Sequence, residues 1–486
     1  MPGSNNPHHR RRRRNQANIL LPLLIAALIA GSAAMIYLSI RLATGSGAPA
    51  SQGGGSGAVQ VPTTKPAKHP ESQPPTQTQP PPEPEHVVST ATISATGDLL
   101  MHSTIFMNNA SVNPECYRGE DGYNFDSIFK FVKEYTSAAD YAIANLETTL
   151  YGPGKPYSGN PKFNTPDEIV DGAKNAGFDM LLTANNHCND TDLQGILRTL
   201  EVVREKGLLT LGTNLTNEED KYQIVDINGI KIGMLCYTYE DSRDPRLETF
   251  NYNPLASAGK GLVCAFPKFP DKSRDPFYEG LEAQMKEMKE KGAEAIVLFL
   301  HWGEEYHLEP SKDQKKMAQK LCDMGVDVIV GGHPHVIQPI ELLTSSTDPE
   351  HKTVCLYSLG NAVSNQRRDK ISSCTTGHTE DGMLFNITFE KYSDGTVYLA
   401  GVDVIPTWVD MHRNEEGKRE YNILPLEDAR RDQWQSMFSL SDSTLQSAAA
   451  SYDRTMELVG AGLEASNSCL SQRKEQRDAD YLAAVS

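Results

Sequence analysis

Histidine, acidic and amide residues follow several apolar runs of the sequence, at the points where those runs end. The stretch Val330-Gly-Gly-His-Pro-His335 places two imidazoles one residue apart after such a run. Imidazole, carboxylate and amide oxygen together form the mixed nitrogen and oxygen shell that suits Mn, Fe or Zn. The other run ends carry Asp98, Asn145, Glu147, Asn186, His187, Asp190 and His301. We therefore expect a site for one or two divalent metal ions.

Single members of this set also have ordinary structural roles. Asp98 could cap a turn, Asn186 could form an Asx turn, and His301 could be a core histidine bonded to a carbonyl. Five apolar runs that all end in Asp, Glu, Asn or His are harder to explain in that way. The combination therefore favours metal ligation over separate structural roles.

Two kinds of element alternate through residues 89–410 and would position these groups. Apolar, β-branched runs are Thr92–Thr96, Tyr141–Leu146, Phe178–Ala184, Leu208–Gly212, Ala293–Leu300 and Val326–Val330. Helical spacing covers Asp126–Ala139, Asp167–Ala176, Asp192–Lys206, Phe277–Lys291 and Ser311–Met324, and several of these helices would end at Gly177, Gly207, Gly292 and Gly325. This alternation predicts an α/β domain with a mainly parallel sheet, whose working groups gather beyond the carboxyl ends of its strands.

Two hairpins interrupt the alternation. Asn228-Gly229 and Asp394-Gly395 are turn dipeptides between apolar runs, and they predict antiparallel strand pairs. We therefore expect two sheets packed face to face with helices outside. Residues 411–486 have a weaker pattern that predicts a mostly helical extension, without a chemical motif, for packing or partner binding.

The ordered motifs of residues 89–405 resemble those of the bacterial capsule-synthesis protein CapA family. They are Gly97-Asp98, Asn145-Leu-Glu147, Asn185-Asn-His187, His301-Trp-Gly303 with Glu305-Tyr306, Gly332-His-Pro-His335 and Tyr357-Ser-Leu-Gly-Asn361. The resemblance implies a role in poly-γ-glutamate capsule production and a fold of the calcineurin-like metallophosphatase superfamily, a four-layer α/β/β/α sandwich. It also implies the metal ligands Asp98, Glu147, Asn186, His301, His333 and His335, with His187 as acid or transition-state stabiliser and Asp190 as its orienting partner.

One departure concerns the first metal ligands. Metallophosphatases usually begin with Asp-x-His, whereas here Asp98 is followed by Leu-Leu-Met and only then by His102. His102 would share a face with Asp98 if this segment were helical, or it is a loop histidine. The second carboxylate motif is replaced by Asn145-Leu-Glu147. We expect His102, Asn145, Glu305, Tyr306 and Asn361 to contact substrate or ligand residues, although Asn361 could equally lie in a tight turn.

The N-terminal part has a different composition. Residues 1–18 are basic, residues 19–41 are almost wholly apolar and long enough to span a bilayer, and residues 42–88 are a Pro, Gly, Ser, Thr and Gln-rich linker. A cleaved secretory signal is the alternative, but the apolar run exceeds a signal core. Five arginines before the span predict a single-pass membrane protein with a cytoplasmic N-terminus and an extracellular C-terminal domain.

Charge and cysteine content limit the possible binding partners and disulfide bonds. The net charge of −17 argues against nucleic acid, and a bound cation could supply local attraction for an anionic substrate. Among the eight cysteines, Cys236, Cys322 and Cys355 lie in apolar patterns and should be buried thiols. The more loop-like cysteines, which could pair, are Cys116, Cys264, Cys374 and Cys469.

Two classes of function follow. The first is a metal-dependent hydrolase or transferase at the cell surface, acting on a phosphoester or on an amide of a polymer such as poly-γ-glutamate. The second is a non-catalytic assembly or export factor that binds anionic polymer or other membrane proteins of capsule synthesis. Cell-wall remodelling is a weaker third option, and no Gly-x-Ser-x-Gly motif supports a nucleophilic serine.

Overall fold

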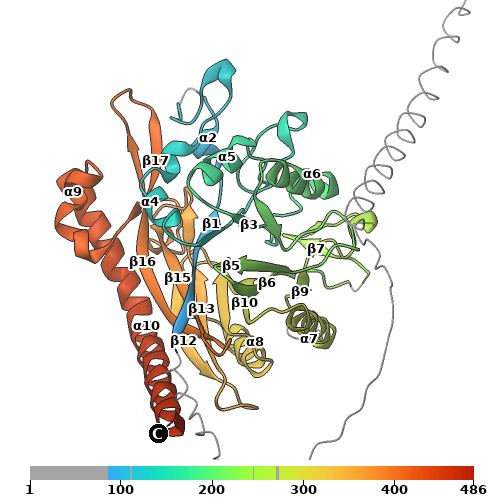
Figure 1. Ribbon diagram of the computed structural model, residues 1–486. Helices are drawn as coiled ribbons and strands as arrows, with labels where there is room; N and C mark the ends of the chain where they lie inside the picture. The colour runs from blue at the N-terminus through green and yellow to red at the C-terminus, as the bar shows by residue number, and fades with distance from the viewer. Residues whose placement is uncertain (1–85, 110–111, 245, 270–272, 486) are drawn as a thin grey trace, which may run out of the picture. The chain divides into compact units, whose positions relative to one another are not determined.

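Two β-sheets and the helices beside them make up the described part of the protein (Figure 1). The computed structural model describes residues 86–109, 112–244, 246–269 and 273–485. The predicted segments 1–18 and 19–41, and nearly all of the linker 42–88, lie outside these ranges. Within the ranges, no helix combines the length and apolarity needed to cross a membrane.

The first sheet has eight strands and is built around β1. Its order is β17 (Arg419–Pro425), β16 (Val397–Arg413), β15 (Asp381–Tyr392), β1 (Val87–Leu99), β2 (Tyr141–Asn145), β3 (Met180–Leu182) and β4 (Leu209–Leu211), with β14 (Asn361–Val363) also paired to β1. The strands from β1 to β4 are parallel, whereas β15, β16 and β17 are antiparallel. The parallel half therefore carries its strand ends, and the polar groups that follow them, to one edge.

The second sheet has seven strands and is also of mixed direction. Its order is β12 (Ile337–Thr344), β13 (Lys352–Leu359), β11 (Val328–Gly332), β10 (Ala295–His301), β6 (Ile230–Glu240) and β5 (Gln223–Ile227), with β9 (Ala265–Pro267) paired to β6. The four central strands, β13, β11, β10 and β6, are parallel. A small separate hairpin joins β7 (Thr249–Phe250) to β8 (Asn253–Pro254).

Most of the predicted helices form close to their predicted bounds. They are α5 (Glu168–Asn175), α6 (Asp192–Glu205), α7 (Asp275–Glu290) and α8 (Lys312–Asp323). Helix α8 begins with a capping box in which Ser311 and Gln314 satisfy each other's backbone amides. The four glycines that follow these helices all have positive φ, as the helix stops required.

One predicted helix is broken. Residues 126–139 form two short helices, α3 (Asp126–Phe129) and α4 (Lys133–Thr136), with a turn between them. Phe129 packs on Phe178 with ring centroids 6.0 Å apart, while Phe131 packs on Phe438 at 5.0 Å. The turn lets these two neighbouring aromatic residues reach different surfaces. The remaining short helices are α2 (Ser103–Phe106) and α9 (Trp434–Met437).

The core divides into layers. One cluster joins side chains of the two sheets, such as Ile93 and Ile143 with Val297 and Val328. A second places α5 and α6 on the other face of the first sheet, and a third places α7 and α8 on the other face of the second sheet. Burial of these apolar faces is the main source of stability and fixes the sheet edges relative to each other.

The C-terminal extension contains a strand and a long helix. Strand β16 continues past residue 410 and pairs with β17, and α10 (Asp442–Val485) then runs beside β16 and β12 (Figure 1). The Asn467 side chain accepts from the Val402 amide at 3.0 Å and donates to its carbonyl at 2.8 Å. Helix α10 therefore contacts strands of both sheets, in agreement with the predicted helical tail.

The cysteines form no disulfide. All eight lie within the described ranges and are free, and only Cys469 is not buried. The predicted buried thiols at Cys236, Cys322 and Cys355 are confirmed. The possible pairing among Cys116, Cys264, Cys374 and Cys469 does not occur in this structure.

Candidate metal centre

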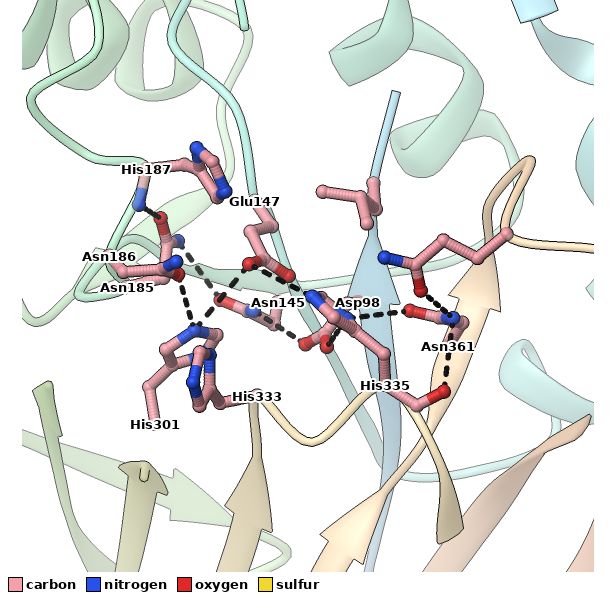
Figure 2. Close-up of polar contacts among 12 residues, drawn as sticks. Asp98, Asn145, Glu147, Asn185, Asn186, His187, His301, His333, His335 and Asn361 are labelled. Carbon is pink, nitrogen blue, oxygen red and sulfur yellow. Dashed lines mark hydrogen bonds and ion pairs between the residues drawn. The ribbon is translucent and has the colours of Figure 1, made fainter. Parts of the chain in front are cut away.

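Polar side chains from the first sheet meet at the carboxyl ends of its parallel strands (Figure 2). Asp98 is at the end of β1 and is fully buried, and Glu147 follows β2 by two residues and is equally buried. Asn145 Nδ2 donates to Asp98 Oδ1 at 2.7 Å, and Asn185 Nδ2 donates to Asn145 Oδ1 at 3.2 Å. This chain of amides holds the Asp98 carboxylate in place.

The second sheet supplies three buried histidines. His301 is the last residue of β10, and His333 and His335 follow β11. His333 and His335 both have positive φ, at 95° and 56°. Such backbone conformations cost of order 1–3 kcal/mol for non-glycine residues and persist where the surrounding structure imposes them, commonly at functional sites.

The two sets of side chains come within ligating distance of one another. Glu147, His333 and His335 each offer a ligand atom within 4.8 Å of the others, and so do Asp98, Glu147 and His301. Glu147 belongs to both groups. Its Oε1 lies 3.5 Å from His301 Nε2 and 4.0 Å from His335 Nε2. Five predicted ligands, with Glu147 between them, therefore surround one small volume.

Several of these buried atoms lack a hydrogen-bond partner within the described residues. Both carboxylate oxygens of Glu147 and the Nδ1 atom of His333 are among them. Asp98 Oδ2 lies 3.2 Å from His335 Nδ1 but accepts no well-aligned hydrogen bond. Leaving a carboxylate buried without partners is costly, whereas a cation would satisfy it. The residues present therefore fit a divalent metal ion.

Burial and mutual charge set the proton affinities of these groups. Burial raises the pKa of Glu147 well above its usual value, and the negative charge of Asp98 adds to the effect. Burial lowers the pKa of His301 to about 3 and lowers that of His333 well below its usual value. These two histidines are therefore neutral, which is the form that ligates metals.

Asp98 and His335 form the exception. Burial alone would raise the pKa of Asp98 and lower that of His335. Their 3.2 Å contact outweighs burial, so the pKa of Asp98 falls and the pKa of His335 rises. Asn361 Oδ1 also lies 3.0 Å from His335 Nδ1. A hydrogen on Nδ1 would leave Nε2 of His335 free to ligate a metal ion.

The predicted acid and its partner form a separate pair beside this centre. His187 Nδ1 lies 2.7 Å from Asp190 Oδ2, and the same oxygen accepts from the Phe163 amide at 2.7 Å. The His187 ring also packs edge-on against Phe163, with centroids 4.6 Å apart. Asp190 and Phe163 thus hold the ring of His187 in one orientation.

Asn186, Asn145 and Asn361 bond other site residues. Asn186 Oδ1 lies 2.8 Å from His301 Nε2, so this amide either ligates beside His301 or orients it. Asn145 bonds Asp98, and Asn361 bonds His335. All three side chains are buried, and through these bonds Asn145 and Asn361 orient candidate ligands.

His102 lies apart from the two ligating groups. The chain from Asp98 to His102 is not helical, and α2 begins only at Ser103. His102 Nδ1 instead lies 3.1 Å from the Leu100 carbonyl and 3.3 Å from the Asn365 amide. The condition under which His102 and Asp98 would share a helix face is therefore not met.

Glu305 and Tyr306 lie on the loop after β10. Glu305 is exposed, and its negative charge adds to the raised pKa of Glu147. Tyr306 OH accepts from Gln366 Nε2 at 3.1 Å, and its ring centroid is 6.2 Å from that of His335. The buried Trp302 donates to the Tyr357 carbonyl at 2.9 Å and forms part of the wall.

Tyr239 is a site residue that the sequence analysis did not select. It lies near the end of β6, and its hydroxyl is 3.3 Å from His333 Nε2. Strand β6 is parallel to β10 and ends at the same edge of the sheet, a pairing that the local sequence pattern does not reveal.

Replacing Gly331 by alanine should destabilise the protein. A Cβ at this position would lie 2.0 Å from the Tyr357 carbonyl oxygen and 2.5 Å from Trp302 Nε1. Because both are buried and fixed, we expect Gly331→Ala to lower the free energy of unfolding by about 1–3 kcal/mol. Chemical denaturation would measure the loss. Gly280→Ala is a suitable control, since a Cβ there meets no atom within 4 Å. Gly395→Ala is not suitable, because its φ of +88° would strain the backbone of an alanine. An unchanged Gly331→Ala midpoint would show that the neighbouring backbone and Trp302 can shift to make room.

The known proteins that match this chain in sequence are proteins of capsule synthesis. A family model described as bacterial capsule synthesis protein PGA_cap matches residues 92–366. The PGA biosynthesis protein CapA of Bacillus subtilis (strain 168) is 28% identical over 288 residues, which is 57% of this chain and 65% of that protein. The capsule biosynthesis protein CapA of Bacillus anthracis is 31% identical over 272 residues, or 53% of this chain and 59% of that protein.

The sequence matches cover part of each relative, and a solved structure also matches part of this chain. The chain spans less than two thirds of the length of either relative. A solved structure, that of TT1561 of Thermus thermophilus, is 9% identical and covers 61% of this chain and 94% of its own, with a TM-score of 0.30.

Proposed function

This chain belongs to the family of bacterial capsule synthesis proteins, and from that premise we propose that it is a metal-dependent hydrolase or transferase of capsule or poly-γ-glutamate biosynthesis. Its substrate is a phosphoester or a γ-glutamyl amide. The apolar segment 19–41 anchors it in the cell membrane with its C-terminal domain outside the cell. Its partners are an anionic polymer such as poly-γ-glutamate and other membrane proteins of capsule synthesis.

One observation carries this proposal. Glu147 is fully buried, both of its oxygens lack hydrogen bonds among the described residues, and imidazoles of the facing sheet surround it. A neutral binding surface has no need of such a carboxylate, whereas a metal ligand set does. The separation of two sheets by a shared core, with helices on each outer face, also supports a metallophosphatase-like four-layer sandwich.

The site residues divide into metal ligands and a residue that carries a proton. Asp98, Glu147 and Asn186 from the first sheet would hold the metal together with His301, His333 and His335 from the second. When bound, one or two Mn, Fe or Zn ions supply a Lewis acid for a phosphoryl or carbonyl oxygen and lower the pKa of water. His187, oriented by Asp190, holds a proton beside the centre and can deliver it to a leaving group.

A non-catalytic assembly or export factor is the second candidate. His102, the histidine nearest in sequence to Asp98, is directed to the Leu100 and Asn365 backbone. The usual Asp-x-His pair therefore has no replacement at this position. A centre with fewer ligands can still shape a cleft that binds anionic polymer without breaking a bond.

Metal analysis tests the first candidate. We expect full-length protein to retain at least one equivalent of transition metal after dialysis, and the His333→Ala, His335→Ala double variant to lose it, because two buried ligands are removed. His412→Ala is a matched control, since His412 lies outside both ligating groups. Absence of stoichiometric metal from the unaltered protein would reject a metal-dependent enzyme.

Turnover separates the two candidates. Phosphoesters and γ-glutamyl amides would be screened with the unaltered protein and with the double variant. Activity that disappears together with the metal supports the enzyme. Polymer production that is restored in cells by the metal-free double variant would instead support the assembly factor.

A further inference from the structure

A groove next to the metal centre contains Lys268, which pairs with no carboxylate of the described residues, and we propose that this groove binds a carboxylate of a polymer unit adjacent to the unit held at the centre. Lys268 would be the residue that recognises this carboxylate. The inference rests on the proposed function, because it deepens the substrate class of the same site. The ligand is a polycarboxylate chain with a γ-linked peptide backbone.

The groove lies directly beside the histidine ligands. It has a volume of about 490 Å³, and its wall includes Tyr239, Phe266, Lys268, Phe269, Arg274 and Trp302. Tyr239 connects it to the centre, because its hydroxyl is 3.3 Å from His333 Nε2 and its ring is 4.9 Å from the His333 ring. Trp302 follows His301 in the chain. A ligand in this groove would therefore reach the metal centre by passing the Tyr239 side chain.

The positive charge of Lys268 is available for a ligand. Its Nζ lies 4.2 Å from the centroid of the Tyr239 ring, and no carboxylate of the described residues pairs with it. Arg274 differs, because its guanidinium forms two hydrogen bonds with Asp313, at 2.9 and 2.8 Å. Lys268 contacts the ring of Tyr239, whose hydroxyl is 3.3 Å from His333 Nε2. It therefore lies near enough to act on whatever the centre binds.

The chemistry of the groove fits a carboxylate polymer. The chain has a net charge of −17, so an anionic polymer needs a local cation in order to approach. Lys268 is half-buried and Lys312, which also lines the groove, is exposed. Of the two carboxylates in the lining, Asp313 is paired with Arg274 and Glu304 is exposed, so the two lysines are the cations left for a ligand within the described lining. Aromatic walls suit the methylene groups that separate successive carboxylates. A phosphate dianion would favour several convergent donors, such as a bidentate arginine, and Arg274 is already engaged.

Calorimetric titration of full-length, manganese-loaded protein with a γ-linked glutamate pentamer tests this assignment. We expect Lys268→Gln to weaken pentamer binding at least about tenfold, because a charge-assisted hydrogen bond is lost. Lys268→Arg keeps the charge and should stay within about threefold. Lys315→Gln is the matched control, since Lys315 is an exposed lysine of α8 that does not line the groove. It should bind like the unaltered protein.

Two further measurements make the result decisive. Metal content and circular dichroism are recorded for every variant, and Lys268→Glu provides a second variant with a larger expected loss. Unchanged pentamer affinity in folded, metal-loaded Lys268→Gln would overturn the inference and leave the metal-dependent function standing. If Lys268→Gln lost binding of inorganic phosphate but kept binding of the pentamer, the inference would also be overturned. Failure of the proposed function would show separately, as absence of metal from the unaltered protein.

Discussion

Glu147→Gln should abolish stoichiometric metal binding while leaving the protein folded. Glu147 is the one residue shared by both ligating groups of the described structure, and a neutral amide offers one weak oxygen where the carboxylate offered two. Loss of residues that merely support ligands commonly costs 10- to 100-fold in metal affinity, so we expect at least about 100-fold here. Titration of chelator-treated protein with Mn²⁺ or Zn²⁺ would measure it.

A matched carboxylate variant provides the control for this result. Glu305 is an exposed carboxylate on the loop after β10 and belongs to neither ligating group. Glu305→Gln should therefore keep metal affinity within a few-fold of the unaltered protein. If Glu147→Gln bound metal as tightly as Glu305→Gln, then Glu147 would not be a ligand.

The same substitution should stabilise the metal-free protein at alkaline pH. In the folded state the pKa of Glu147 lies well above its ordinary value of 4.5. Above pH 4.5 the folded chain therefore binds more protons than the unfolded chain. Stability therefore falls as pH rises through this interval. Glutamine exchanges no proton, so in chelator Glu147→Gln should exceed the unaltered protein by about 1–3 kcal/mol at pH 8. The difference should shrink toward pH 4.5, and a constant difference would contradict this account.

Arg454→Ala should cost about 3 kcal/mol of unfolding free energy, the largest loss of stability that we expect from a single side chain of α10. Arg454 donates to both oxygens of Asp381, with Nε to Oδ2 at 2.8 Å and a terminal nitrogen to Oδ1 at 2.6 Å. The Asp381 side chain is only 2% exposed. Removing the arginine leaves a buried carboxylate with Ser451 as its remaining side-chain donor.

Denaturant unfolding would compare this variant with an exposed ion pair. Arg431 and Asp453 form such a pair, 3.0 Å apart, with side chains 40% and 65% exposed, so Arg431→Ala should change stability by less than about 1 kcal/mol. The double variant Arg454→Met, Asp381→Asn should recover part of the loss, because the unpaired charge is gone. Equal effects of Arg454→Ala and Arg431→Ala would show that Asp381 finds another partner.

The positions of the candidate ligands could be predicted because strand ends are a local property. A run of β-branched residues followed by Asp98, Glu147 or His301 specifies both the strand and the edge at which the side chain emerges. Parallel strands place such residues together without any knowledge of long-range contacts. Five of the six predicted ligands accordingly fall into the two ligating groups, and Asn186 bonds one of them, His301.

Features that depend on distant contacts were not predictable in this way. Tyr239 becomes a site residue only because β6 is parallel to β10, and His102 is drawn to the backbone of Asn365, far along the chain. Strand β17 and the docking of α10 depend on the exposed side of β16, which local patterns do not reveal. The break in the helix predicted at residues 126–139 likewise reflects Phe131 packing on Phe438.

The position of β1 determines when the ligand set can assemble. This strand is the first of the described chain, yet it lies between β2 and β15 and also pairs with β14, whose Asn361 is in register with Asp98. Such non-local pairing slows folding, because the chain must close a long loop before the contacts form. A nascent chain that has emerged only as far as the end of β11 contains four of the six candidate ligands and lacks His333 and His335, as well as β14 and β15, which pair with β1. The ligand set can therefore be complete only after the chain beyond β11 has been synthesised.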